Sequence, residues 1–170
     1  MQIRPLSSHT GAEVLGIDLT QPVSESDRAA MNRAFVERSV LVVRDQALTP
    51  PQVVEAVGLF GTIFPQQNTK FAIADCPQIH YVSNQDRFPD GRRYIPGDGW
   101  HTDHSYDQLP AMGSLLYARE VPQTGGDTLF ASMYAAYDAL SDGLKQTLAG
   151  LRALHSSRHV FGVARPGMEG

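Results

Sequence analysis

The first sixty residues alternate between short stretches rich in apolar residues and longer stretches that mix apolar and polar residues. The segment 12–19 alternates loosely between apolar and polar residues, which is typical of a short strand, and the segment 40–46 begins with apolar, β-branched residues, which is typical of a buried strand. The segments 26–39 and 50–60 each follow a capping pattern and are predicted to be helices. This half of the chain therefore predicts the order strand, helix, strand, helix.

Capping residues define where the two helices begin and end. Ser24 with Asp27 resembles a capping box at the start of the first helix. Thr49 with Gln52 forms the same pattern before the second helix, and Gly61 is a typical residue to end it.

After residue 61 the sequence becomes less regular, and its predicted helices are shorter. Residues 85–99 are rich in Gly, Pro and Asp, which predicts a long loop. Ser132 and Ser141 each precede a short amphipathic stretch and could cap a short helix. Apolar or alternating stretches predict strands at 78–84, 111–121, 128–133 and 151–162.

Composition narrows the class of protein. The chain has 170 residues, 42% of them apolar, and a formal net charge of −4, which predicts one globular domain over residues 1–170. The sequence has no cluster of Lys and Arg that would suggest nucleic-acid binding, and no apolar run is long enough to span a membrane. With no apolar leader and with Cys76 as the single cysteine, we expect a cytoplasmic protein without disulfides.

The stretch "GDGWHTDHSY" at 97–106 carries the most distinctive chemistry. If residues 100–104 are extended, His101 and Asp103 project to the same face, because side chains at i and i+2 do so in a strand. An imidazole and a carboxylate side by side are two of the three ligands of non-haem iron(II) oxygenases. The alternative is a surface His–Asp pair beside a turn.

A second motif follows the first by about twenty residues. In "TGGDTLF" at 124–130, two glycines allow a tight turn and Thr128 offers a hydroxyl at the start of a predicted strand.

Together, "WHTD", "GGDTL" and "AAYDAL" strongly resemble the taurine dioxygenase and phenoxyacetate-herbicide dioxygenase family. The resemblance reaches back through "LVVRDQALTPPQVVEAVGLFG" and covers nearly all of the chain. It implies an α+β, mainly β fold: a double-stranded β-helix, or jelly roll, with flanking helices. It also implies Fe(II), 2-oxoglutarate as co-substrate, and O₂.

Carried over by residue, the resemblance makes His101 and Asp103 the first two iron ligands. It makes Thr128 the threonine whose hydroxyl binds the 2-oxoglutarate carboxylate. The family's third ligand, a histidine, and its 2-oxoglutarate-binding arginine are expected beyond Gly170. The chain is therefore expected to be the N-terminal portion of such a domain, with a jelly roll incomplete at its C-terminus.

The resemblance also suggests the substrate class, a small anionic organic molecule such as a sulfonate, sulfate ester or aryloxy acid. Asn84, Arg93 and Tyr106 are pocket candidates because they lie near the motif in sequence. Gly97 and Gln66 stand where the taurine enzyme has polar contacts to the sulfonate, which argues against taurine itself.

Two other readings stay open. The chain could be a truncated, inactive remnant or a partner subunit, and missing strands would expose apolar surface that a homo-oligomer would cover. It could also be a hydrolase or simple metal-binding barrel in which His104 joins His101 and Asp103.

Overall fold

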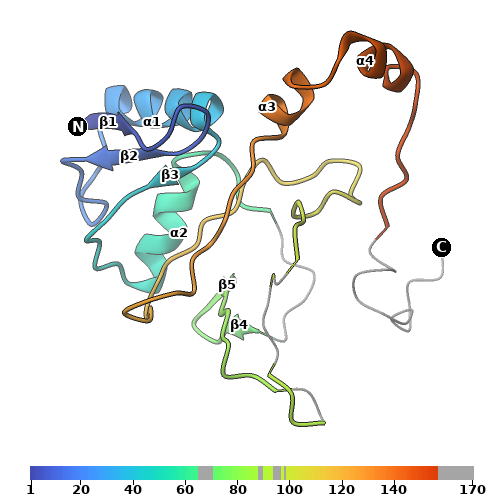
Figure 1. Ribbon diagram of the computed structural model, residues 1–170. Helices are drawn as coiled ribbons and strands as arrows, with labels where there is room; N and C mark the ends of the chain where they lie inside the picture. Colours follow the sequence, from blue (N-terminus) through green and yellow to red (C-terminus); the bar gives the residue numbers. More distant parts are fainter. Residues whose placement is uncertain (65–70, 88–89, 94–96, 98, 157–170) are drawn as a thin grey trace. The chain divides into compact units, whose positions relative to one another are not determined.

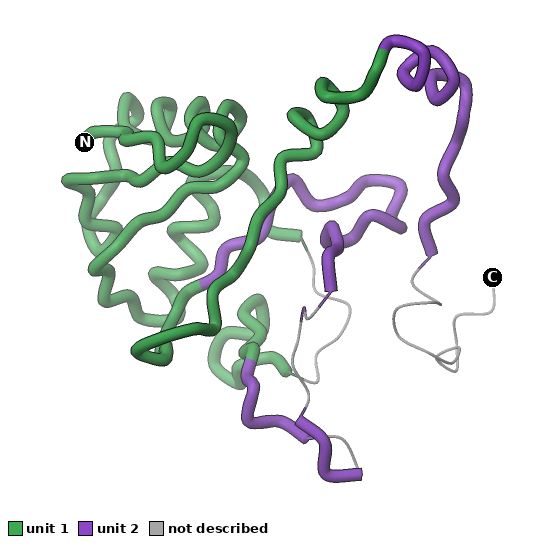
Figure 2. The backbone as a smooth tube through the Cα atoms, viewed as in Figure 1, with its two compact units in different colours: residues 1–82, 117–141 green, residues 83–116, 142–170 purple. Residues whose placement is uncertain are grey.

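The computed structural model describes residues 1–64, 71–87, 90–93, 97 and 99–156. The chain divides into two compact units, one made of residues 1–82 and 117–141 and the other of residues 83–116 and 142–170 (Figure 2). Each unit is described by itself. The prediction of a single domain over residues 1–170 stays a prediction.

The first unit is built on a three-stranded sheet in the order β1-β2-β3 (Figure 1). Strand β1 (Gln2–Pro5) pairs antiparallel with β2 (Ala12–Leu15), and β2 pairs parallel with β3 (Leu41–Val42). A parallel pair needs a crossover connection, and helix α1 (Glu25–Arg38) supplies it. The predicted order of the first sixty residues is confirmed, preceded by the unpredicted strand β1.

Helix α1 begins as its capping residues predict. The Ser24 hydroxyl accepts a hydrogen bond from the backbone N–H of Asp27 at 3.1 Å, which satisfies one of the free donors of the first turn. The helix contacts all three strands and buries Met31 and Ala34.

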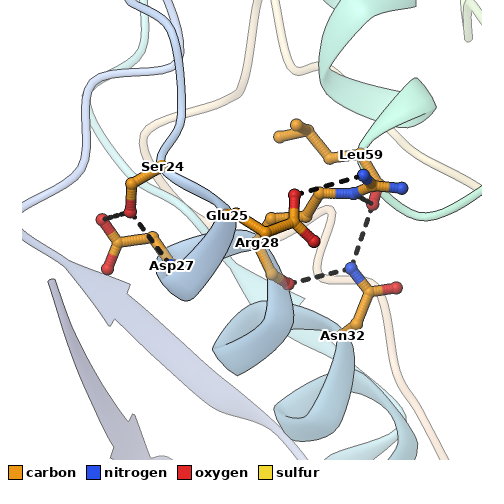
Figure 3. A network of polar contacts seen from close by, with 6 residues as sticks. All are labelled: Ser24, Glu25, Asp27, Arg28, Asn32 and Leu59. Atoms are coloured by element: carbon orange, nitrogen blue, oxygen red, sulfur yellow. Dashed lines mark hydrogen bonds and ion pairs between the residues drawn. The ribbon is translucent and has the colours of Figure 1, made fainter.

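Polar side chains of α1 also hold the end of the next helix. Arg28 Nε and Asn32 Nδ2 both donate to the carbonyl oxygen of Leu59, each at 3.0 Å (Figure 3). Leu59 is the C-cap of α2 (Pro50–Gly58), so its carbonyl lacks a partner within its own helix. The two donors thereby fix α2 against α1.

Helix α2 has the predicted capping box between Thr49 and Gln52, but it ends at Gly58 and not at Gly61. Its buried Val53 and Ala56 form a core cluster with Leu48. Around this cluster pack the partly buried side chains of Leu19, Ile79 and Tyr117.

Tyr117 ties a distant segment to this core. Its hydroxyl accepts from the Leu48 N–H at 2.9 Å and donates to the Gln46 carbonyl at 3.1 Å. The unit also holds the antiparallel pair β4 (Ala72–Ile73) and β5 (Cys76–His80). Strand β5 replaces the predicted strand at 78–84.

The second half of the chain corrects the sequence prediction. Two short helices follow their predicted serines, α3 (Met133–Asp138) in the first unit and α4 (Asp142–Leu148) in the second. The strands predicted at 111–121 and 128–133 do not form, and neither does the described part, 151–156, of the last one. Residues 157–162 lie outside the described part of the chain.

The reason is that an alternating pattern marks the two faces of a strand without providing a hydrogen-bonded neighbour. Among the described residues 99–156, no segment pairs with another as a strand. An α+β class is confirmed for the described residues. Their helices span more residues than their strands, so the expected mainly β character is not seen there. No helix among them is long and apolar enough to cross a membrane.

Candidate metal centre

His101 and Asp103 lie on irregular backbone at the start of a turn, and not on the predicted strand 100–104. Their side chains nevertheless meet. Nε2 of His101 lies 3.2 Å from Oδ1 of Asp103, and each side chain is about half exposed. The predicted pairing is therefore confirmed as geometry, although the expected strand is not.

The other ring nitrogen of His101 is held by the backbone. Nδ1 lies 2.8 Å from the carbonyl oxygen of Gly99. A carbonyl only accepts, so Nδ1 carries the proton and donates. This leaves the Nε2 lone pair of the neutral ring for a metal, in the way that metal-binding histidines are commonly oriented.

Gly97 lies against the edge of the same ring. Its backbone is left-handed, with φ of 74°, and a Cβ placed there would lie 3.4 Å from Cε1 of His101. Glycine adopts this conformation without the steric cost that other residues carry. Gly97 therefore borders the imidazole, and its alignment with a substrate contact stays a prediction.

The two oxygens of Asp103 have different surroundings. Oδ2 accepts a hydrogen bond from the hydroxyl of Ser114 at 2.7 Å. Oδ1 faces Nε2 of His101. One oxygen is therefore engaged by the protein, and the other is directed at the imidazole.

The separation of the two donor atoms fits a shared metal ion. Imidazole nitrogen and carboxylate oxygen bind divalent metals at about 2.0–2.2 Å. Two ligands at that distance and at right angles to each other lie about 3 Å apart, as neighbouring ligands of an octahedral ion do. The observed 3.2 Å between Nε2 and Oδ1 meets this requirement.

His104 has a different role from the one that the rival metal site requires. Its Nδ1 lies 2.9 Å from Oδ2 of Asp107, and the Asp107 N–H donates to the His104 carbonyl at 3.0 Å. The backbone of His104 is left-handed, with φ of 54°. Among the residues that the structure describes, no group of three or more His, Cys, Asp or Glu side chains is placed to hold a metal.

Thr128 belongs to the first unit and is described there by itself. It is exposed and follows a turn in which Gly125 and Gly126 have φ of 75° and 73°. A Cβ at Gly126 would lie 3.1 Å from Cγ of Pro122, so the predicted tight turn needs glycine here. The role of Thr128 toward 2-oxoglutarate stays a prediction.

The three pocket candidates lie in the same unit as His101 and Asp103. Tyr106 is part of the turn that begins at Asp103, with its ring centroid 5.8 Å from that of His104. Arg93 is exposed and forms a backbone bridge with Arg87. Asn84 accepts a hydrogen bond from the side chain of its neighbour Gln85. Gln66 lies outside the described residues.

The sequence pattern did not point to Ser114, to the Gly99 carbonyl or to Asp107. Ser114 is eleven residues from Asp103, and no residue spacing reports such a contact. A backbone carbonyl has no sequence signature at all. His104 and Asp107 are an i, i+3 pair, which a turn prediction over 103–107 would have brought together.

Comparison with known proteins defines the class. A family model described as "Taurine catabolism dioxygenase TauD, TfdA family" matches residues 2–169. The chain belongs to this family.

Individual relatives agree. The chain is 35% identical, over 93% of its length and 60% of the relative's, to an alpha-ketoglutarate-dependent 2,4-dichlorophenoxyacetate dioxygenase of Cupriavidus pinatubonensis. A taurine dioxygenase from Burkholderia xenovorans matches with a TM-score of 0.73 and 31% identity, over 88% of this chain and 51% of that one. The structure of AAD-2 with Mn(II) and N-oxalylglycine matches with a TM-score of 0.69 and 32% identity, over 97% and 57%. The chain thus spans little more than half the length of these relatives.

Proposed function

We propose that this chain carries part of the active site of an Fe(II)- and 2-oxoglutarate-dependent dioxygenase. Such an enzyme hydroxylates a C–H bond of its substrate with O₂, while 2-oxoglutarate is converted to succinate and CO₂. The observation that carries the proposal is the 3.2 Å approach of His101 Nε2 and Asp103 Oδ1, in a chain that belongs to this family.

His101 and Asp103 would hold the iron. The Gly99 carbonyl keeps the His101 proton on Nδ1, so Nε2 is available without a change of tautomer. Fe(II) bound there would offer coordination positions to 2-oxoglutarate and O₂ and would supply the chemistry that oxidises the substrate. Two protein ligands leave further positions for these molecules and for a third side chain.

Thr128 would donate a hydrogen bond to a carboxylate of 2-oxoglutarate, since its hydroxyl is exposed after the Gly125–Gly126 turn. We further propose the double-stranded β-helix as the fold and the cytoplasm as the location. Support for the fold comes from the solved relatives, which match at 31–32% identity.

The substrate would be a small organic anion. The relatives named above act, by their names, on an aryloxy acid and on a sulfonate. Arg93 is an exposed cation in the unit that contains His101 and Asp103, and it suits a carboxylate, sulfonate or sulfate ester. Asn84 and Tyr106 would supply neutral contacts.

A second candidate is a remnant or partner subunit without activity of its own. It is favoured by the described residues, which place no group of three or more His, Cys, Asp or Glu side chains to hold a metal. The two candidates differ in whether the chain binds a metal together with a 2-oxoglutarate analogue.

Metal binding tests the proposal directly. We expect the chain to bind Mn(II), and N-oxalylglycine to tighten this binding, because both would share one site. His101→Ala and Asp103→Ala should each weaken Mn(II) binding by more than the roughly 10–100-fold typical of changes outside the ligand shell. Electron paramagnetic resonance of free Mn(II) measures the affinity.

His9→Ala is the matched control, because His9 is an exposed histidine that is far from His101 and Asp103 in the sequence. It should bind Mn(II) like the unsubstituted chain. Equal Mn(II) affinity in all four proteins would contradict the proposed site.

A further inference from the structure

Asp103 needs support if it is to act as a ligand. Its side chain is about half exposed, and the torsion that turns a carboxylate is soft. An unsupported carboxylate in water would present either oxygen, or both, to a metal ion. A neighbouring group must therefore bind one carboxylate oxygen if the other is to be held toward His101.

Ser114 is placed to make this choice. Its hydroxyl donates to Oδ2 of Asp103 at 2.7 Å, the usual length of an O–H···O bond to a carboxylate. An ionised carboxylate only accepts hydrogen bonds, so the proton belongs to the serine. With Oδ2 engaged, Oδ1 is the oxygen 3.2 Å from Nε2 of His101.

The backbone on the other side of Asp103 is also constrained. His104, the next residue, has a left-handed backbone with φ of 54°. Its side chain pairs with Asp107 at 2.9 Å, and its carbonyl accepts from the Asp107 N–H at 3.0 Å. The turn therefore fixes where the Asp103 side chain starts, and Ser114 fixes where it points.

We propose that Ser114 is a positioning residue for the metal ligand Asp103: its hydroxyl retains Oδ2 so that Oδ1 alone is presented beside His101. Ser114 does not touch the metal or the substrate. It acts through Asp103, as residues around metal sites commonly orient the ligands. This inference rests on the proposed function, since it assigns a ligand-supporting role within the same site.

The test compares Mn(II) affinity of the full chain with that of Ser114 variants. Ser114→Ala should bind Mn(II) about 10–100-fold more weakly, the usual effect of removing a hydrogen bond to a metal ligand. Ser114→Thr keeps the hydroxyl and should stay near the unsubstituted affinity. In Ser114→Val the side chain has nearly the same shape as threonine but lacks the hydroxyl, so this variant should bind Mn(II) as weakly as Ser114→Ala.

Co(II) provides a readout that loss of stability alone would not move. In Ser114→Ala and Ser114→Val the carboxylate is free to bind through both oxygens, so the visible Co(II) spectrum should change. In Ser114→Thr the spectrum should not change. Ser105→Ala is the matched control, since Ser105 forms no side-chain hydrogen bond with any described residue. It should leave affinity and spectrum unchanged.

The outcomes separate this inference from the proposed function. If His101→Ala and Asp103→Ala lose Mn(II) while Ser114→Ala and Ser114→Val keep it, the role of Ser114 is wrong and the metal site stands. If the unsubstituted chain does not bind Mn(II), or the ligand variants bind it equally well, both are overturned. If Ser114→Ala does not fold, equal Mn(II) affinity in the Thr and Val variants overturns the inference.

Discussion

Gly97 borders the His101 ring and has a left-handed backbone. A Cβ at this position would lie 3.4 Å from Cε1 of His101, which is a van der Waals contact, so the conformation of the backbone is what opposes a side chain here. The hydrogen bond from Nδ1 to Gly99 then sets the tautomer. The Gly99 carbonyl thus holds Nδ1 of His101, while Nε2 faces Asp103.

Gly97→Ala should lower the free energy of unfolding by about 1–2 kcal/mol, the cost of a left-handed conformation for an L-residue. Gly97→Asn should cost less, because asparagine tolerates this conformation. Gly99→Ala is a suitable control, since no described atom lies within 4 Å of where its Cβ would be. Urea denaturation measures all three, and an unchanged midpoint for Gly97→Ala would contradict the strain.

At the level of elements, the β1-β2-β3 sheet contains a buried charge. Glu13 of β2 is 4% exposed and receives hydrogen bonds from Arg4 of β1 and from Arg44, which follows β3. The hydrogen bond from Arg4, and then that from Arg44, lower the pKa of Glu13 below its ordinary value of 4.5, against the opposing effect of burial. The two arginines thereby link the carboxylate of the central strand β2 to β1 and to the segment that follows β3.

This pairing predicts acid sensitivity. A carboxyl whose pKa is lower in the folded state contributes stability above its unfolded pKa, and this contribution is lost as pH falls through the folded pKa. The melting temperature should therefore decline below about pH 4.5, and Glu13→Gln should melt lower at pH 7 and depend less on acid. Glu25→Gln, at an exposed position, is the control. Parallel melting curves of Glu13→Gln and the parent from pH 7 to pH 3 would refute this.

On the scale of the whole molecule, the second half of the chain leaves many large apolar side chains in solvent. They include Leu109, Leu116, Leu129, Tyr134 and Leu154, each at least 70% exposed. Exposed apolar surface of this kind is typical of a surface that contacts another segment or chain. A homo-oligomer stays a prediction.

We expect residues 1–170 alone to show little or no 2-oxoglutarate-dependent turnover. The described residues supply two half-exposed side chains as proposed ligands, and efficient oxidation needs an ordered pocket that holds the substrate C–H bond near the oxidant. The measurement is succinate formation with Fe(II), ascorbate and a panel of aryloxy acids and sulfonates. Robust succinate release that His101→Ala abolishes would show that the chain completes its own site.

Several features of this protein could be predicted from the sequence because they depend on near neighbours. The caps of α1 and α2 follow from Ser24 and Thr49, since capping is a contact within one turn. His101 and Asp103 meet as expected, but on irregular backbone and not on the strand from which their meeting was predicted. Family membership, predicted from short motifs, is confirmed by a family model that matches residues 2–169.

Only the tertiary structure shows the contacts between residues that are far apart in the sequence. Ser114 selects an oxygen of Asp103 from eleven residues away, and Tyr117 joins Leu48 and Gln46 across about seventy. Neither contact has a spacing that a pattern could reveal. The strands predicted after residue 100 failed for the same reason: alternation sets the faces of a strand, but only a neighbouring backbone satisfies its N–H and C=O groups.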